Sequence, residues 1–75
     1  MKELLEFILK RITSKPDNLT IEEKKDHTGT IFVITLADED KGKVIGKNGS
    51  NIKAIKAILS ILARPKGEIF FLKIE

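Results

Sequence analysis

Apolar residues recur at every third or fourth position in two stretches of the chain, and this spacing predicts two amphipathic helices. The first covers residues 2–13, and the second runs from Ser50 to about Ala63. Charged, polar or small residues fill the positions between the apolar ones. The inner face expected for the second helix consists of Ile52, Ile55, Leu59 and Leu62, with Ile58 alongside.

Three other stretches have the composition of β-strands. Residues 30–37 are rich in β-branched and aromatic residues and carry almost no charge, so this run predicts a strand in the middle of a sheet. Residues 19–25 are apolar only at Leu19 and Ile21, as expected of an edge strand. Residues 68–74 form the last predicted strand.

A short helix is expected between the middle strand and the second long helix, over about residues 40–45. The acidic run Asp38-Glu39-Asp40 favours an N-cap and a first helical turn there, and Ser50 is a candidate N-cap of the long helix. Because a crossover between two strands of one sheet is right-handed, the last strand is expected to lie parallel to the middle one. The chain is therefore predicted to form an α+β fold with a three-stranded mixed sheet.

Two glycines three positions apart, Gly46 and Gly49, separate the short helix from the long one. A helix that stops just before another begins needs a residue free to adopt positive φ, and Gly46 meets that need. Gly49 lets a ligand come close to the chain. The open N–H groups and the positive end of the second helix favour an anion, and Lys47 adds a full charge at the tip of the turn. A nucleic-acid backbone is the natural ligand of such a turn.

The twelve residues from Val44 to Ile55 read V-I-G-K-N-G-S-N-I-K-A-I and resemble the signature of the KH family of single-stranded RNA-binding modules, V-I-G-x-x-G-x-x-I-x-x-I. Every fixed position matches. In that family the G-x-x-G loop clamps the backbone of about four nucleotides, and the bases lie in an apolar groove beside it. The order of elements is similar to the prokaryotic type II KH arrangement, α-β-β-α-α-β with three helices on one face of the sheet. The size resembles the small single-domain bacterial KhpA-like proteins.

The resemblance implies RNA contacts on both sides of the loop, and Lys47 is the side chain best placed to meet a phosphate. Lys43 and Lys56 are either further ligands or solvated charges, as lysines on helices usually are. The floor of the groove is expected to include Ile45, Ile52 and residues 69–72, although each of these also suits core packing. The candidate RNA-binding residues are Ile45, Gly46, Lys47, Asn48, Gly49, Ser50, Asn51 and Lys53, together with Lys43 and Lys56.

Two other interpretations of the glycine pair fit the sequence less well. A Walker phosphate loop needs four residues between its glycines, followed by Gly-Lys-Ser/Thr, and the stretch from Gly46 to Ser50 lacks that spacing. Asn48-Gly49 is also a hairpin signal. The helical periodicity on both sides of the turn argues against a hairpin.

Composition agrees with one small globular domain, expected to cover residues 1–75. The net charge of +3 is unevenly distributed. Residues 1–40 carry six Lys or Arg against nine Asp or Glu, whereas residues 41–75 carry eight against two. A polyanion-binding face would leave such an asymmetry, and so would a solvated lysine-rich helix.

Several chemistries are not supported by the sequence. The chain has no Cys and a single histidine, His27 in a turn, so neither a metal site nor a bound cofactor is expected. No nucleophile comes with a plausible base and orienting group, and the chain is not expected to be an enzyme. Charged residues interrupt the N-terminal apolar run, which argues against a signal peptide or a membrane span and favours a cytoplasmic protein.

The family resemblance implies a post-transcriptional regulator or RNA chaperone that binds single-stranded RNA. It also implies a heterodimer with a larger KH-containing RNA-binding protein; a homodimer is the alternative, and the sheet supports it. Residues 31–36 and 69–72 are apolar on both faces of the expected sheet, so one face should stay exposed and attract a partner. The alternatives are a protein interaction module that uses this face and a protein that binds single-stranded DNA.

Overall fold

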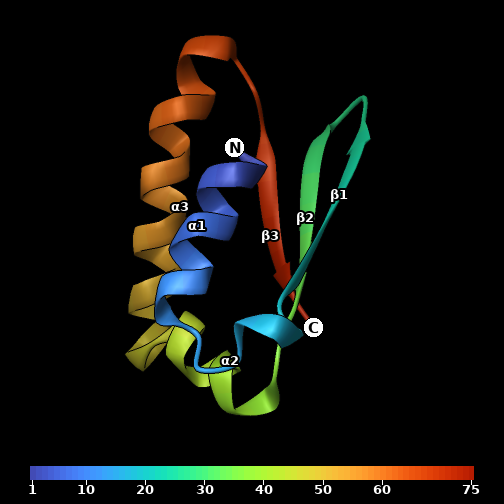
Figure 1. Cartoon of the computed structure of the whole chain (residues 1–75). Coiled ribbons are helices and arrows are strands. Elements are labelled where there is room, and N and C mark those ends of the chain that lie inside the picture. Colours follow the sequence, from blue (N-terminus) through green and yellow to red (C-terminus); the bar gives the residue numbers. More distant parts are fainter.

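The computed structural model describes residues 1–75 and places the helices and strands in the predicted order (Figure 1). Short 3-10 turns at Pro16–Asn18, Lys47–Gly49 and Arg64–Lys66 join some of them. The main elements are α1 (Lys2–Ile12), β1 (Thr20–Asp26), β2 (Gly29–Thr35), α2 (Asp38–Ile45), α3 (Ser50–Ala63) and β3 (Phe70–Ile74). This is the α-β-β-α-α-β order of a type II KH fold.

The three strands form one mixed sheet in the order β1-β2-β3. β1 pairs with β2 in the antiparallel direction, and β3 pairs with β2 in the parallel direction. At mid-sheet Phe32 lies between Glu23 of β1 and Leu72 of β3. The predictions of a central second strand, an edge first strand and a parallel last strand are confirmed.

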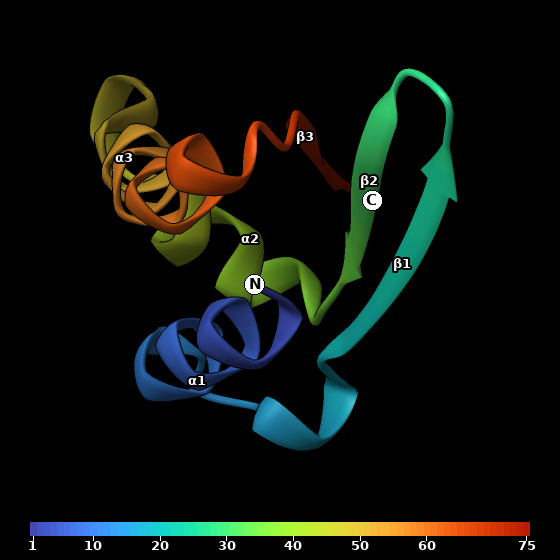
Figure 2. The same ribbon diagram turned by 90° about the horizontal axis from the view of Figure 1, so that it is seen from above.

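All three helices lie on the same side of the sheet (Figure 2). Side chains from both layers meet between them, because the inward residues of β2 alternate with outward ones. Phe32 and Ile34 of β2 have no exposed surface, nor do Leu5 and Leu9 of α1. The buried cluster consists of Leu5, Leu9, Phe32, Ile34, Leu36, Val44, Ile55 and Leu59.

The structure corrects part of the inner face predicted for the long helix. Ile55 and Leu59 are buried and Ile52 packs against the core, as expected, whereas Leu62 is exposed over 44% of its surface. Ala63 is buried instead. After this residue the 3-10 turn Arg64–Lys66 leads the chain back toward the sheet, and the N–H of Glu68 donates to the carbonyl of Ala63 at 3.0 Å.

Two predicted helix caps are also wrong. The N-cap of α3 is Gly49, because the N–H of Ser50 already donates to the carbonyl of Lys47 and Ser50 has helical angles. The N-cap of α2 is Ala37, without a side-chain hydrogen bond. The acidic run does occupy the first turn of α2, but its third residue, Asp40, is buried and binds a different part of the chain.

The face of the sheet that points away from the helices exposes apolar side chains, as the sequence predicted. Ile31 on β2 and Phe71 on β3 are paired in the register and lie on this face. Phe71 is exposed over 53% of its surface and Ile31 over 36%. None of the helices has the length and apolar character that crossing a membrane requires.

Candidate nucleic-acid interface

The loop between α2 and α3 is built from backbone conformations that most residues avoid. Gly46 ends α2 with φ 75° and ψ 175°, a region that is essentially restricted to glycine. Asn48 and Gly49 follow in the left-handed region, with φ 56° and 76°. Asparagine tolerates that region better than most residues, so the sequence K-N-G suits the turn.

The two glycines meet different requirements. A Cβ on Gly46 would lie 2.7 Å from Cγ and 2.9 Å from Cβ of Asn51, so the protein itself fills that space. A Cβ on Gly49 would meet only the Cγ2 atom of Ile52, at an ordinary contact distance of 3.8 Å. Gly49 is therefore needed for its positive φ, and its surroundings leave the backbone open to approach from outside.

Two backbone donors of the loop have no partner among the turn, loop and cap hydrogen bonds. The N–H of Gly49 donates to the carbonyl of Gly46 at 3.2 Å, but no turn, loop or cap hydrogen bond engages the N–H of Lys47 or Asn48. The N-terminus of α3 follows, and its first turn contains no acidic residue. Unengaged backbone donors and the positive end of a helix thus follow one another in the chain, which favours a negatively charged ligand.

Cations without an acidic partner continue from the loop along α3. Each lysine of β1 and α2 forms an ion pair within 4.0 Å, for example Lys41 with Asp38 at 3.1 Å. The five cations from the loop to the end of the following 3-10 turn form none. They are Lys47, Lys53, Lys56, Arg64 and Lys66. The positive charge that the sequence places in its second half is therefore concentrated on one helix and its two ends.

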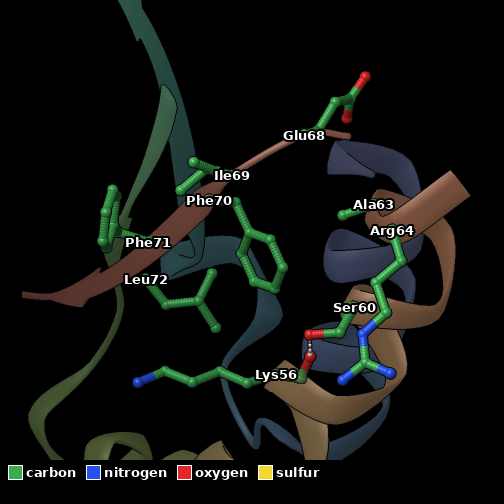
Figure 3. A pocket seen from close by; sticks show the side chains of 9 residues that line it. All are labelled: Lys56, Ser60, Ala63, Arg64, Glu68, Ile69, Phe70, Phe71 and Leu72. Atoms are coloured by element: carbon green, nitrogen blue, oxygen red, sulfur yellow. Dashed lines mark hydrogen bonds between the residues drawn. The ribbon is translucent and has the colours of Figure 1, made fainter. Parts of the chain in front are cut away.

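A groove of about 390 Å³ lies between α3 and β3. Lys56 and Ser60 of α3 and Arg64, the first residue of the 3-10 turn that follows, are spaced four residues apart and form one wall. Phe70 and Leu72 of β3 face them across the opening (Figure 3). The remaining lining residues are Ala63, Glu68, Ile69 and Phe71. From Gly49 to Lys56 the helix rises about 10 Å, so the groove begins one and a half to two turns from the loop.

The structure places several predicted site residues apart from this groove. Of residues 69–72, expected on the groove floor, Phe70 and Leu72 point into it, whereas the side chain of Phe71 points to the other side of the strand (Figure 3). Ile45 and Ile52 do not line it: Ile45 is exposed over 39% of its surface beside the loop, and Ile52 packs against the core. Lys47, Asn48, Ser50 and Lys53 are exposed on the loop and on the first turn of α3. Lys56 is on the groove wall.

Two candidate residues are already engaged within the protein. The ammonium of Lys43 donates to Oγ of Ser14 and lies 3.8 Å from Oδ1 of Asp40. The side-chain amide of Asn51 donates to the carbonyl of Lys43 at 2.6 Å. The pKa of Asp40 lies below its ordinary value, mainly because the N–H of Ser14 stabilises the carboxylate, with help from Lys15 and Lys43 and against the effect of burial.

Sequence reasoning missed Ser60 and Arg64 as groove residues. The signal was present in their spacing, since residues 56, 60 and 64 recur every four positions and therefore share one flank of a helix. Groups of three or more His, Asp or Glu side chains that would hold a metal ion are absent from the structure.

A G-x-x-G loop that joins two helices between parallel strands defines a KH domain, and the fold and the loop of this chain meet that definition. The sequence agrees. Residues 2–74 match the family described as KhpA/KhpB, KH domain. The chain belongs to this family of KH domains, which are not enzymes.

Proteins named RNA-binding protein KhpA are among its similar relatives. The chain is 41% identical to that of Thermotoga maritima over 69 residues, which cover 92% of each chain. It is 40% identical over 63 residues to those of Chlamydia trachomatis and Clostridium acetobutylicum. These alignments cover 84% of this chain and 81% and 84% of the two relatives.

Proposed function

We propose that this protein binds single-stranded RNA, with the sugar-phosphate backbone held at the loop from Gly46 to Gly49 and the bases directed toward the groove between α3 and β3. One observation carries the proposal. An open loop, a row of cations without acidic partners and an apolar groove lie in sequence along one flank of α3. The names of the relatives support RNA as the ligand.

The loop supplies the first contacts. The N–H groups of Lys47 and Asn48 are free to donate to a phosphate, and the Lys47 ammonium adds a charge that can approach a phosphate oxygen. Asn48 and Ser50 offer side-chain donors beside it. Gly49 has no side chain to keep the strand away from these donors. In this proposal the loop fixes the position of the strand and contributes little to the choice of sequence.

The flank of α3 continues the contact. Lys53 and Lys56 lie one turn apart and can each neutralise a phosphate. Arg64 offers a flat guanidinium on which a base can stack, and Phe70 and Leu72 supply apolar surface on the opposite wall. Only unpaired bases can enter such a groove, because the bases of a double helix are paired and stacked in the interior of that helix. This is why we propose a single-stranded ligand.

A single loop that contacts mainly the RNA backbone is expected to bind weakly and with little sequence preference, and this suggests a biological role. A protein of this kind suits a post-transcriptional regulator or an RNA chaperone in the cytoplasm, where contacts must form and release quickly. Association with a second copy, or with a larger KH-containing protein, would raise the effective concentration of binding sites on one RNA. The family name joins KhpA with KhpB and supports that heteromeric arrangement.

A second candidate function, protein interaction through the sheet, has one observation in its favour. Ile31, Ile69 and Phe71 are exposed, although Ile31 and Phe71 belong to the most apolar strands of the chain. Light scattering over a dilution series tests it. A mass that rises with concentration is expected, and a strict monomer at high concentration would exclude self-association through this face.

Reversing the charge of the loop tests the RNA proposal. The variant Lys47→Asp with Asn48→Asp keeps both glycines, and we expect it to fold normally and to lose binding to a single-stranded RNA oligonucleotide. The matched control, Lys25→Asp with His27→Asp, makes the same change in charge at the β1–β2 turn, at the other end of the molecule (Figure 1). Equal binding by both variants would place the site elsewhere, and equal affinity for RNA and DNA oligonucleotides would favour the DNA alternative.

A further inference from the structure

A buried carboxylate ties the end of α1 to α2. Asp40 has no exposed surface, and its two oxygens each accept a backbone hydrogen bond. The N–H of Ser14 donates to Oδ1 at 2.8 Å, and the N–H of Lys15 donates to Oδ2 at 2.9 Å. These donors follow the last turn of α1, so one side chain fixes both the position and the direction of the chain as it leaves that helix.

Lys43 completes this contact and extends it toward the loop. It lies one turn after Asp40 on α2, and its ammonium lies 3.8 Å from Oδ1 of Asp40 and donates to Oγ of Ser14. A buried carboxylate is stable only when charges and donors compensate it, and Lys43 supplies the compensating charge. The Lys43 ammonium is thus held at the C-terminal end of α1, beside Ser14.

The backbone carbonyl of Lys43 accepts a hydrogen bond from Asn51, a residue of α3 on the other side of the glycine loop. The carbonyl of Lys43 belongs to the last turn of α2, where carbonyls lack a helical partner, and the side-chain amide of Asn51 donates to it at 2.6 Å. The Asn51 side chain also occupies the space where a Cβ on Gly46 would lie. Asn51 therefore connects α2 with α3 across the glycine loop.

We propose that Asp40 is a positioning residue for the loop from Gly46 to Gly49: its contacts with the end of α1 and with Lys43 hold α2 in the orientation that Asn51 then fixes relative to α3. The geometry of the RNA-binding loop is set, through this chain of contacts, by a carboxylate that the RNA does not touch. The effect on binding rests on the proposed function, whereas the effect on the loop does not.

A positioning role and a simple charge effect predict opposite results. Replacing Asp40 by Asn removes a negative charge from the helix that leads into the loop, and electrostatics alone would then strengthen RNA binding. The Asn side chain keeps one acceptor oxygen but presents an NH2 group to the other backbone N–H, so one of the two backbone bonds is lost. That loss would instead release α2 and weaken binding. Glu39→Gln is the matched control, because it removes one charge at the neighbouring position from an exposed side chain whose partner is the ammonium of Lys15, at 2.7 Å.

The experiment measures RNA affinity and loop structure for Asp40→Asn, Glu39→Gln and the wild type. We expect Glu39→Gln to bind a single-stranded RNA oligonucleotide as the wild type does, or slightly more tightly. Asp40→Asn should bind roughly two- to thirtyfold more weakly, the range found when residues away from a site alter its affinity. In the RNA-free protein, the amide resonances of residues 46–51 should shift or broaden in Asp40→Asn alone.

Each other outcome has a defined meaning. Asp40→Asn with the affinity and loop resonances of Glu39→Gln would overturn the proposal. If Asp40→Asn does not fold, the variant Asn51→Ala tests the proposal instead, because it removes the hydrogen bond from the Asn51 side chain to the carbonyl of Lys43. Unchanged amide resonances for residues 46–49 in this RNA-free variant would overturn the proposal. If the wild type binds no RNA, the proposed function fails, while the resonances of the RNA-free variants still test the positioning role.

Discussion

The affinity for RNA should fall with salt at a rate set by the cations of the loop and α3. Four of them, Lys47, Lys53, Lys56 and Arg64, border the proposed path of the strand and form no ion pair. Each phosphate that a cation neutralises releases counterions, so the logarithm of the binding constant falls linearly with the logarithm of the salt concentration. The slope therefore counts the contacts.

The expected magnitude follows from that count. For a single strand the slope is about −0.7 per neutralised phosphate, so four contacts give about −2.8, or a loss of about 50-fold in affinity between 50 and 200 mM salt. The variant Lys53→Gln with Lys56→Gln removes two contacts. Its slope should be about −1.4, and its affinity should fall only about sevenfold over the same range.

Fluorescence anisotropy with a labelled single-stranded RNA oligonucleotide, repeated at several salt concentrations, gives these slopes. The control Lys24→Gln with Lys25→Gln makes the same change in charge on β1, where both lysines are paired with Glu22 and Glu23. It should leave the slope near −2.8 within about half a contact. If both double variants changed the slope equally, the net charge of the protein and not the flank of α3 would govern binding.

Three further results are expected. Gly46→Ala should lower the free energy of unfolding by about 1–3 kcal/mol in urea denaturation, because of its φ of 75° and its close approach to Asn51, whereas Gly42→Ala, with open space around it, should not destabilise α2. Leu59→Ala should cost about 2–5 kcal/mol because Leu59 is fully buried, and an unchanged midpoint would show that α3 does not pack as described. The folded-state pKa of Asp40 lies below its ordinary value of 3.8, so the stability it contributes is constant above that pH and is lost as the pH falls further; acid titration of Asp40→Asn should show a weaker loss below about pH 4 than the wild type.

The elements of this fold were predictable because the signals for them are local. Gly46 marked the end of α2, and the apolar period after the loop predicted the extent of α3, from Ser50 to about Ala63. The uncharged, β-branched run of β2 identified the central strand. The cation row and the exposed sheet face could be anticipated for the same reason. The excess of positive charge and the apolar residues on both faces of the strands are visible in short stretches of sequence.

The contacts that hold the loop could not be predicted, because their partners are far apart in the sequence. Asp40 appeared to be a helix cap, but it binds backbone groups 25 and 26 positions earlier, which local propensity does not reveal. Asn51 appeared to face the RNA, but a bond across the turn uses its amide. Polar residues near a motif thus have two competing uses, and only the three-dimensional arrangement shows which groups remain open to a ligand.

The most direct test of the central claim is to map the RNA contact by NMR. A titration of the isotopically labelled protein with a short single-stranded RNA should shift the amide resonances of residues 46–50, of Lys53 and Lys56, and of residues 69–72 across the groove. The same RNA annealed to its complement should produce much smaller shifts. Shifts confined to β1 or to the exposed face of the sheet, with the loop from Gly46 to Gly49 unaffected, would contradict the account.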